Sequence, residues 1–150
     1  MAAVALLAAF AGGWVAYAHW QQGGARPLAY RDLTARLGPL QFPRPTFRVF
    51  LKPEKLVTYL DAIMPGRAPA PPPIDFAHRK AILISVGPRS STGYAVRIVR
   101  VVEERSRVVV VAREQTPTLR DRVVPGVTFP YRLITIPRRS KRTAFELEGR

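Results

Sequence analysis

The 150-residue sequence contains no cysteine and only two histidines. Without cysteine, thiolate catalysis, disulfide cross-links and cysteine-ligated zinc or iron–sulfur sites are excluded. The ten acidic residues form no spaced motif of the kind that binds calcium or another cation. We therefore expect no metal and no cofactor, and a fold that depends on packing for its stability.

Catalytic patterns are equally scarce. Asp75 precedes His78 by three residues, a spacing that would suit the orienting half of a hydrolase triad, but no serine lies in a G-x-S-x-G pattern. An aspartate at such a position is more typical of a residue that caps a turn or helix. We predict no catalytic residue, no enzymatic activity and no small-molecule substrate.

Acidic residues are few in comparison with basic ones, 10 against 24, which gives a net charge of +14. The 47% of apolar residues suffices for one small core. Four basic residues form a dense cluster, namely Arg138, Arg139, Lys141 and Arg142. This cluster suits a polyanion such as nucleic acid, anionic lipid or a wall polymer, bound with strong salt dependence, and it equally suits a solvated surface. No recognition helix or stacking motif accompanies it.

Charged residues are absent from the first twenty positions. Residues 2–20 are long enough for a short membrane-spanning helix, and Ala16-Tyr17-Ala18, with its two small residues, fits the cleavage site of a secretory signal. We expect residues 1–20 to be a signal peptide or a membrane anchor, and the protein to be exported to the cell envelope. Because the first basic residue, Arg26, follows this segment, charge counting also leaves a cytoplasmic orientation open.

The rest of the chain divides into three parts. Residues 21–46 are rich in Gln, Gly, Pro and Arg and predict a tether with one short helix. Residues 47–142 are expected to form the folded domain, and residues 143–150 a tail. The domain begins with a strand-length apolar run, and Pro53 then opens a helix with one apolar stripe.

The second half of the domain changes to period-two patterning with many β-branched residues. This pattern predicts strands at 80–86, 94–102, 107–112 and 131–136. A bulge is expected near Val99, where the apolar positions change parity. The predicted fold class is mainly β (α+β), a small antiparallel sheet or sandwich with one covering helix, preceded by an N-terminal hydrophobic helix.

Short motifs follow one another through this half of the chain. In order they are Asp75-Phe76, Lys80 to Val86 with Gly87, Gly93-Tyr94, Arg113-Glu114 with Pro117, Thr128-Phe129-Pro130-Tyr131 and Ile136-Pro137-Arg138. Their order and spacing resemble the PrcB-like domain family, named for an accessory subunit of a bacterial surface protease complex. The sequence departs from the family at 90–92 and 117–121, where family members usually carry glycine. The resemblance implies an exported or envelope-attached module that docks or stabilises a protease without catalytic residues of its own.

A second, local similarity concerns the loop Ser91-Thr92-Gly93-Tyr94. It is similar to a loop of chagasin-type cysteine-protease inhibitors, in which that loop blocks the protease cleft. The same four residues also fit an ordinary β-turn, in which Gly93 supplies a positive φ.

We expect a non-enzymatic interaction module, an accessory or stabilising subunit whose partner is another envelope protein, either a protease or a multi-subunit surface assembly. The predicted partner-binding residues lie in two loops: Ser90, Ser91, Thr92, Gly93 and Tyr94, and Phe129, Pro130 and Tyr131. Aromatic residues beside turns are natural anchors, although core packing is the alternative for them. The alternative functions are a basic envelope protein that binds a polyanion and, third, a protease inhibitor.

Overall fold

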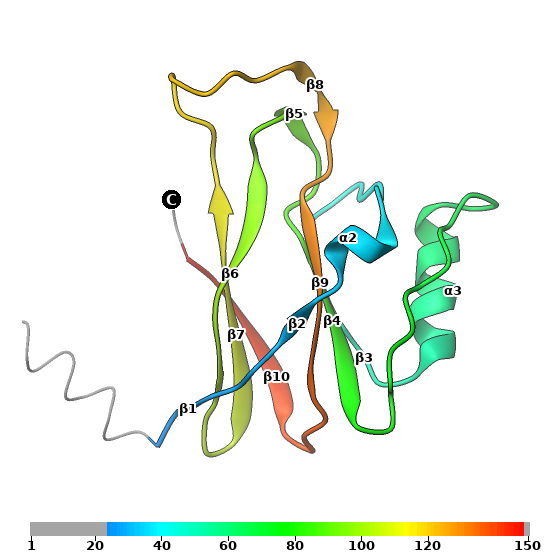
Figure 1. The fold of residues 1–150 in the computed structure, drawn as a ribbon, viewed down its shortest axis with the longest axis vertical. Helices are drawn as coiled ribbons and strands as arrows, with labels where there is room; N and C mark the ends of the chain where they lie inside the picture. The colour runs from blue at the N-terminus through cyan, green and yellow to red at the C-terminus, as the bar shows by residue number, and fades with distance from the viewer. Residues whose placement is uncertain (1–23, 149–150) are drawn as a thin grey trace, which may run out of the picture.

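The computed structural model describes residues 24–148, so the expected signal peptide or anchor over residues 1–20 lies outside the described residues. Two four-stranded sheets pack against each other, and a two-stranded arm extends from one end (Figure 1). Sheet A has the order β1 (Arg26–Pro27), β6 (Ala95–Glu103), β7 (Arg107–Gln115), β10 (Arg142–Glu148). Sheet B has the order β2 (Arg31–Asp32), β9 (Tyr131–Pro137), β4 (Arg79–Ser85), β3 (Thr46–Phe50). The arm pairs β5 (Arg89–Ser91) with β8 (Pro125–Thr128).

The space between the two sheets is filled by alternate residues of their strands. Ile82 and Ile84 of β4 meet Val108 and Val110 of β7 in one apolar cluster, and all four are fully buried. Successive side chains of a strand point to opposite faces, so a period-two apolar pattern produces such a layer. The mainly β class is thereby confirmed, and of the two expected arrangements, a sheet or a sandwich, the structure has the sandwich.

A second apolar cluster covers the opposite face of sheet B. The helix α3 (Pro53–Ile63) buries Leu56 and Leu60 against Leu83 and Leu133 of that sheet. Proline at the first helical position begins the helix as expected, since its fixed φ suits a helix start. The expected covering helix is therefore present, and it lies on the outside of sheet B (Figure 1).

The strands predicted in the second half of the chain are all present. Their observed bounds differ from the predicted ones by at most three residues. The pairing of β6 with β7 shifts register between Ile98 and Arg100, which confirms the bulge expected near Val99.

The segment expected to be a tether is packed onto the domain. A short helix is present at α2 (Thr34–Leu37), but Leu33, Leu37, Leu40 and Phe42 all enter the cluster on sheet B, with Phe42 completely buried. The strands β1 and β2 pair with different sheets, so the chain between them links sheet A to sheet B (Figure 1). The prediction of a tether over residues 21–46, with the domain beginning at 47, was therefore wrong for the described residues.

The expected tail is also part of the fold. β10 pairs in parallel with β7 along its whole length, with Phe145 opposite Val110, and the Phe145 ring packs against the inter-sheet cluster. The domain therefore extends to at least residue 148, and sheet A is mixed where an antiparallel sheet was expected. Within residues 24–148, no helix is long and apolar enough to cross a membrane.

Candidate functional site

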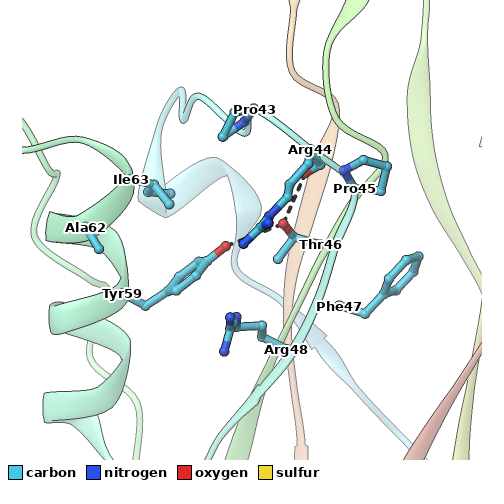
Figure 2. A pocket seen from close by; sticks show the side chains of 9 residues that line it. All are labelled: Pro43, Arg44, Pro45, Thr46, Phe47, Arg48, Tyr59, Ala62 and Ile63. Carbon is cyan, nitrogen blue, oxygen red and sulfur yellow. Dashed lines mark hydrogen bonds between the residues drawn. The ribbon is translucent and has the colours of Figure 1, made fainter.

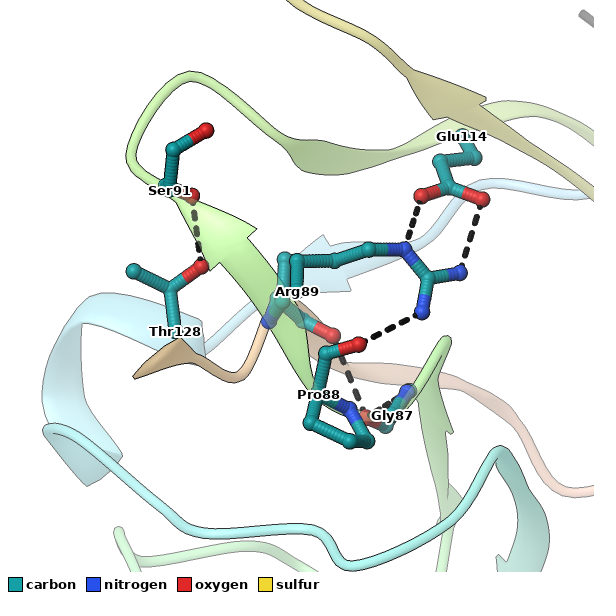
Figure 3. Close-up of polar contacts among 8 residues, drawn as sticks. Gly87, Pro88, Arg89, Ser91, Glu114 and Thr128 are labelled. Atoms are coloured by element: carbon teal, nitrogen blue, oxygen red, sulfur yellow. Dashed lines mark hydrogen bonds and ion pairs between the residues drawn. The ribbon is translucent and has the colours of Figure 1, made fainter. Parts of the chain in front are cut away.

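The arm brings together two loops that are about thirty residues apart in the sequence. We define it as residues 88–94 and 116–128. β5 and β8 pair antiparallel, with Ser91 opposite Pro125. Beyond this pair, the Thr92 N–H donates to the Val124 carbonyl at 3.0 Å, and the Val124 N–H donates to Thr92 Oγ1 at 2.9 Å. The Thr128 hydroxyl donates to the Ser91 carbonyl at 2.8 Å (Figure 3). The arm is thus an ordered element rather than two separate loops.

Gly93 occupies a turn of the arm that only glycine fits well. Its φ is +97°, which side chains of L-residues rarely adopt. A Cβ at this position would lie 2.8 Å from Val123 Cγ1 and 3.0 Å from Pro117 Cβ. The positive φ agrees with the β-turn expected at this loop, and Pro117 and Val123 of the second segment of the arm lie against that turn.

A half-buried ion pair holds the base of the arm. The guanidinium of Arg89 makes a two-pronged contact with the Glu114 carboxylate, in which the Arg89 Nη2–Glu114 Oε2 distance is 2.9 Å (Figure 3). A third hydrogen bond, at 2.8 Å, runs from Arg89 to the Pro88 carbonyl. The carboxylate side chain is only 11% exposed, and its hydrogen bonds hold the pKa of Arg89 above its usual value. Such paired charge-assisted hydrogen bonds are directional, so they orient the arm relative to β7.

The outer part of the arm exposes aliphatic side chains. Leu119 is fully exposed, Val127 is 70% exposed and Val124 is 65% exposed. With Val123, they account for four of the ten large apolar residues that are exposed in the described chain, and all four lie within nine positions. Single exposed apolar residues are normal, but several of them on one short segment are typical of an interaction surface.

The predicted partner-binding residues are divided between this arm and the core. Ser90, Thr92 and Gly93 are exposed on the arm, while Ser91 and Tyr94 are half-buried there. Phe129, Pro130 and Tyr131 are half-buried where the arm joins sheet B, and both aromatic rings pack against the cluster under α3.

Tyr131 is held tightly at this junction. Its hydroxyl donates to the carbonyl oxygens of Thr34 and Gly38, and its ring centroid lies 5.4 Å from that of Phe42. Burial raises the pKa of Tyr131 to about 12. These contacts agree with the core-packing alternative for Tyr131, whose side chain ties the N-terminal segment to the domain.

The basic cluster is partly neutralised by acidic residues. Glu103 forms ion pairs with Lys141 at 3.0 Å and with Arg139 at 3.4 Å, and the hydrogen bond from Lys141 contributes most to a lowered pKa of Glu103. Arg138 donates to the Phe76 carbonyl at 2.6 Å, and Arg142 begins β10 with its side chain exposed. The four basic side chains therefore do not form a continuous free patch.

Asp75 and His78 are in contact but lie on the surface. The distance from His78 Nδ1 to Asp75 Oδ2 is 2.7 Å, and the two side chains are 82% and 59% exposed. The other carboxylate oxygen accepts the N–H of Ala77, as expected of a residue that caps a turn. Among residues 24–148, no three His, Asp or Glu side chains gather in a way that would hold a metal ion.

The aliphatic residues of the arm and the Arg89–Glu114 pair are not among the residues predicted from the sequence. A docking surface was predicted in this part of the chain, but with aromatic anchors. Leu119, Val124 and Val127 follow no periodic pattern, so only their exposure on an ordered arm distinguishes them from core residues. No sequence signal links Arg89 to Glu114, which are 25 positions apart.

Comparison with known proteins gives one match. Residues 80–137 match the family described as PrcB C-terminal, a range that begins in β4, ends in β9 and includes the whole arm. This match confirms the resemblance on which the sequence analysis relied. No curated protein and no solved structure matches the chain. The similarity of the Ser91–Tyr94 loop to chagasin-type inhibitors has no support from these comparisons.

Proposed function

We propose that this chain, which carries a PrcB-like C-terminal domain over residues 80–137, is a non-catalytic accessory subunit that docks another protein at the cell envelope. The family match supports an accessory role in a protease complex. The proposed partner is a protease or another subunit of such a complex. The proposed contact surface is the outer part of the arm.

The observation that carries this proposal is the exposed aliphatic cluster on an ordered arm. Burial of apolar surface drives protein association, and a preorganised surface loses less conformational entropy when it binds. The arm meets both conditions, because Leu119, Val124 and Val127 are exposed while Gly93 and the Arg89–Glu114 pair fix the backbone beneath them.

The polyanion-binding alternative has less support from the described residues. Arg139 and Lys141 both pair with Glu103, so part of the charge of the basic cluster is already compensated. A surface that binds through charge also loses affinity steeply as salt concentration rises, whereas an apolar contact does not. Salt dependence therefore separates the two functions.

The test is photo-crosslinking with the full chain in native envelope membranes. A photoreactive residue at position 119 is expected to give one discrete protein adduct that persists in membranes washed with concentrated salt. The matched control is the same photoreactive residue at Val57 of α3, an apolar position that is 39% exposed and lies away from the arm. The intact mass of the recovered chain also reports whether the N-terminal segment has been removed.

The adduct is expected to disappear when Val124 and Val127 are both replaced with aspartate, because two charges replace the exposed aliphatic surface. Equal crosslinking from positions 119 and 57 would contradict docking through the arm. Loss of every adduct in the salt wash would favour the polyanion-binding function instead.

A further inference from the structure

A groove of about 750 Å³ lies between α3 and β3, and no residue of the arm lines it (Figure 2). Prolines and the side chains of Tyr59 and Ile63 form part of its wall. Arg44 and Arg48 also line the groove, and no acidic residue does. Among residues 24–148, neither arginine forms an ion pair with an acidic side chain. The groove therefore presents uncompensated positive charge on a partly apolar wall.

The strand at the side of this groove is an edge strand. β3 comes last in the order of sheet B and pairs with β4 alone among the described strands. In an antiparallel pair, alternate residues direct their N–H and carbonyl groups away from the partner strand. Such an edge can accept a further extended segment, which is a common way of binding a peptide. β3 is five residues long, which is sufficient for a short segment of this kind.

Successive side chains of β3 point to opposite faces of sheet B. Thr46 and Arg48 face α3, where the Tyr59 hydroxyl lies 3.5 Å from Thr46 Oγ1 and the Arg48 guanidinium carbon lies 4.9 Å from the centre of the Tyr59 ring (Figure 2). Phe47 points to the other side, where its ring centroid lies 5.5 Å from that of Phe145 (Figure 2). Phe47 is still 37% exposed. The tyrosine face holds the Arg48 guanidinium at the groove, since cations are attracted to aromatic rings.

We infer that this groove binds an extended, acidic segment of a partner polypeptide, which adds to β3 as a further strand of sheet B. Acidic side chains on one face of that segment would meet Arg44 and Arg48 beside α3. Aliphatic side chains on its other face would cover Phe47. The arm plays no part in this contact, so the inference goes beyond the proposed function and does not depend on it.

A second copy of this chain is a poorer occupant of the same edge. If two β3 strands paired with each other, the arginines of both copies would be brought onto neighbouring strands. Like charges opposite one another on paired strands are destabilising. Charge complementarity therefore favours an acidic segment, and self-association becomes an outcome of the test.

The probe is a fluorescein-labelled peptide of alternating residues, Glu-Val-Glu-Val-Glu-Val-amide, titrated with the full chain in mild detergent and followed by fluorescence anisotropy. Saturable binding is expected. The double variant R44E/R48E is expected to weaken it at least about tenfold, because both positive charges of the groove are reversed. The matched control is R105E, which reverses the charge of an exposed arginine in the β6–β7 hairpin. This variant is expected to bind the peptide with unchanged affinity.

Three results would overturn the inference. The first is the absence of saturable binding. The second is an equal loss of affinity per reversed charge in R105E and R44E/R48E, which would indicate attraction to net charge alone. The third is unchanged affinity for the same peptide with N-methylated valines, because a strand that adds to an edge needs its N–H groups.

Sedimentation of the chain without peptide tests whether a second copy of the chain occupies the edge of β3. Self-association that R44E/R48E abolishes would identify a second copy as the occupant and overturn the acidic-segment inference. Crosslinking from position 119 in the R44E/R48E variant reports separately on the arm, so a failure of this inference is distinguishable from a failure of the proposed function.

Discussion

Replacing Phe42 with alanine is expected to lower the free energy of unfolding by about 4 kcal/mol. Truncation of a fully buried phenylalanine removes its transfer free energy and leaves a cavity, which together cost about 3 to 5 kcal/mol. Phe42 is completely buried and also makes a tilted ring contact with Tyr131, and such pairs add about 0.5 to 1.5 kcal/mol. This loss is a large part of the total stability of about 5 to 15 kcal/mol that is usual for a domain.

Urea denaturation of the full chain in mild detergent measures this loss. The far-ultraviolet circular dichroism of the sheets is the appropriate signal, because both tryptophans, Trp14 and Trp20, lie outside the described residues. With a slope of about 2 kcal/mol per molar urea, the midpoint is expected to fall by about 2 M. The matched control is Tyr30→Ala in the same segment, where the side chain is 40% exposed and a loss below about 1 kcal/mol is expected.

The same experiment decides whether residues 24–46 belong to the core. If Phe42→Ala and Tyr30→Ala have the same midpoint as the unaltered chain, then Phe42 contributes nothing to stability and the segment is a tether after all. A similarly large loss of unfolding free energy in both variants would contradict the conclusion that Phe42 lies in the core and Tyr30 on the surface.

Three further predictions concern the arm and the ion pairs. Gly93→Ala is expected to cost about 1 to 3 kcal/mol through backbone strain and to speed amide hydrogen exchange in the arm, whereas exchange in β4 stays unchanged. Arg89→Lys keeps the charge but loses the two-pronged contact with Glu114, so faster exchange at the base of the arm is expected, and unchanged exchange would refute the role given to that pair. Glu103 has a folded-state pKa below its unfolded value, so its stabilisation is present above about pH 4.3 and is lost as the pH falls through the folded-state pKa. The variant Glu103→Gln is therefore expected to lose stability less steeply on acidification than the unaltered chain, and parallel pH profiles of the two would argue against the pair with Lys141.

The strands and the main helix could be predicted from the sequence because their patterns are local. β4, β6, β7 and β9 each carry an apolar or alternating run that their own residues specify, and Pro53 marks the start of α3. The bulge in β6 was also predictable, since a change of parity within one strand requires an extra residue. The family resemblance was carried by motifs of the same region, residues 80–137.

The two ends of the domain were predicted wrongly as a tether and a tail. Phe145 and Leu147 alternate with Glu146 and Glu148, a period-two pattern typical of a strand, so a signal for β10 was present in the segment that was predicted to be a tail. Its parallel pairing with β7 was not predictable, because the local sequence pattern of a strand does not specify which other strand it pairs with. In the segment before β3, Leu33, Leu37, Leu40 and Phe42 are separated mainly by polar residues, Gly38 and Pro39, and only contact with sheet B makes them core residues.

The sequence by itself determined the β-rich class, the approximate bounds of the central strands and helix, and the match of residues 80–137 to the family described as PrcB C-terminal, because hydrophobic period and turn-forming residues act over a few positions. Only the tertiary structure decided which surfaces remain open. The exposure of Leu119 depends on the β5–β8 pairing, and the uncompensated charge of Arg44 and Arg48 depends on the packing of α3 beside an edge strand. Both are long-range properties, since exposure and charge pairing are set by residues that are distant in the chain and near in space.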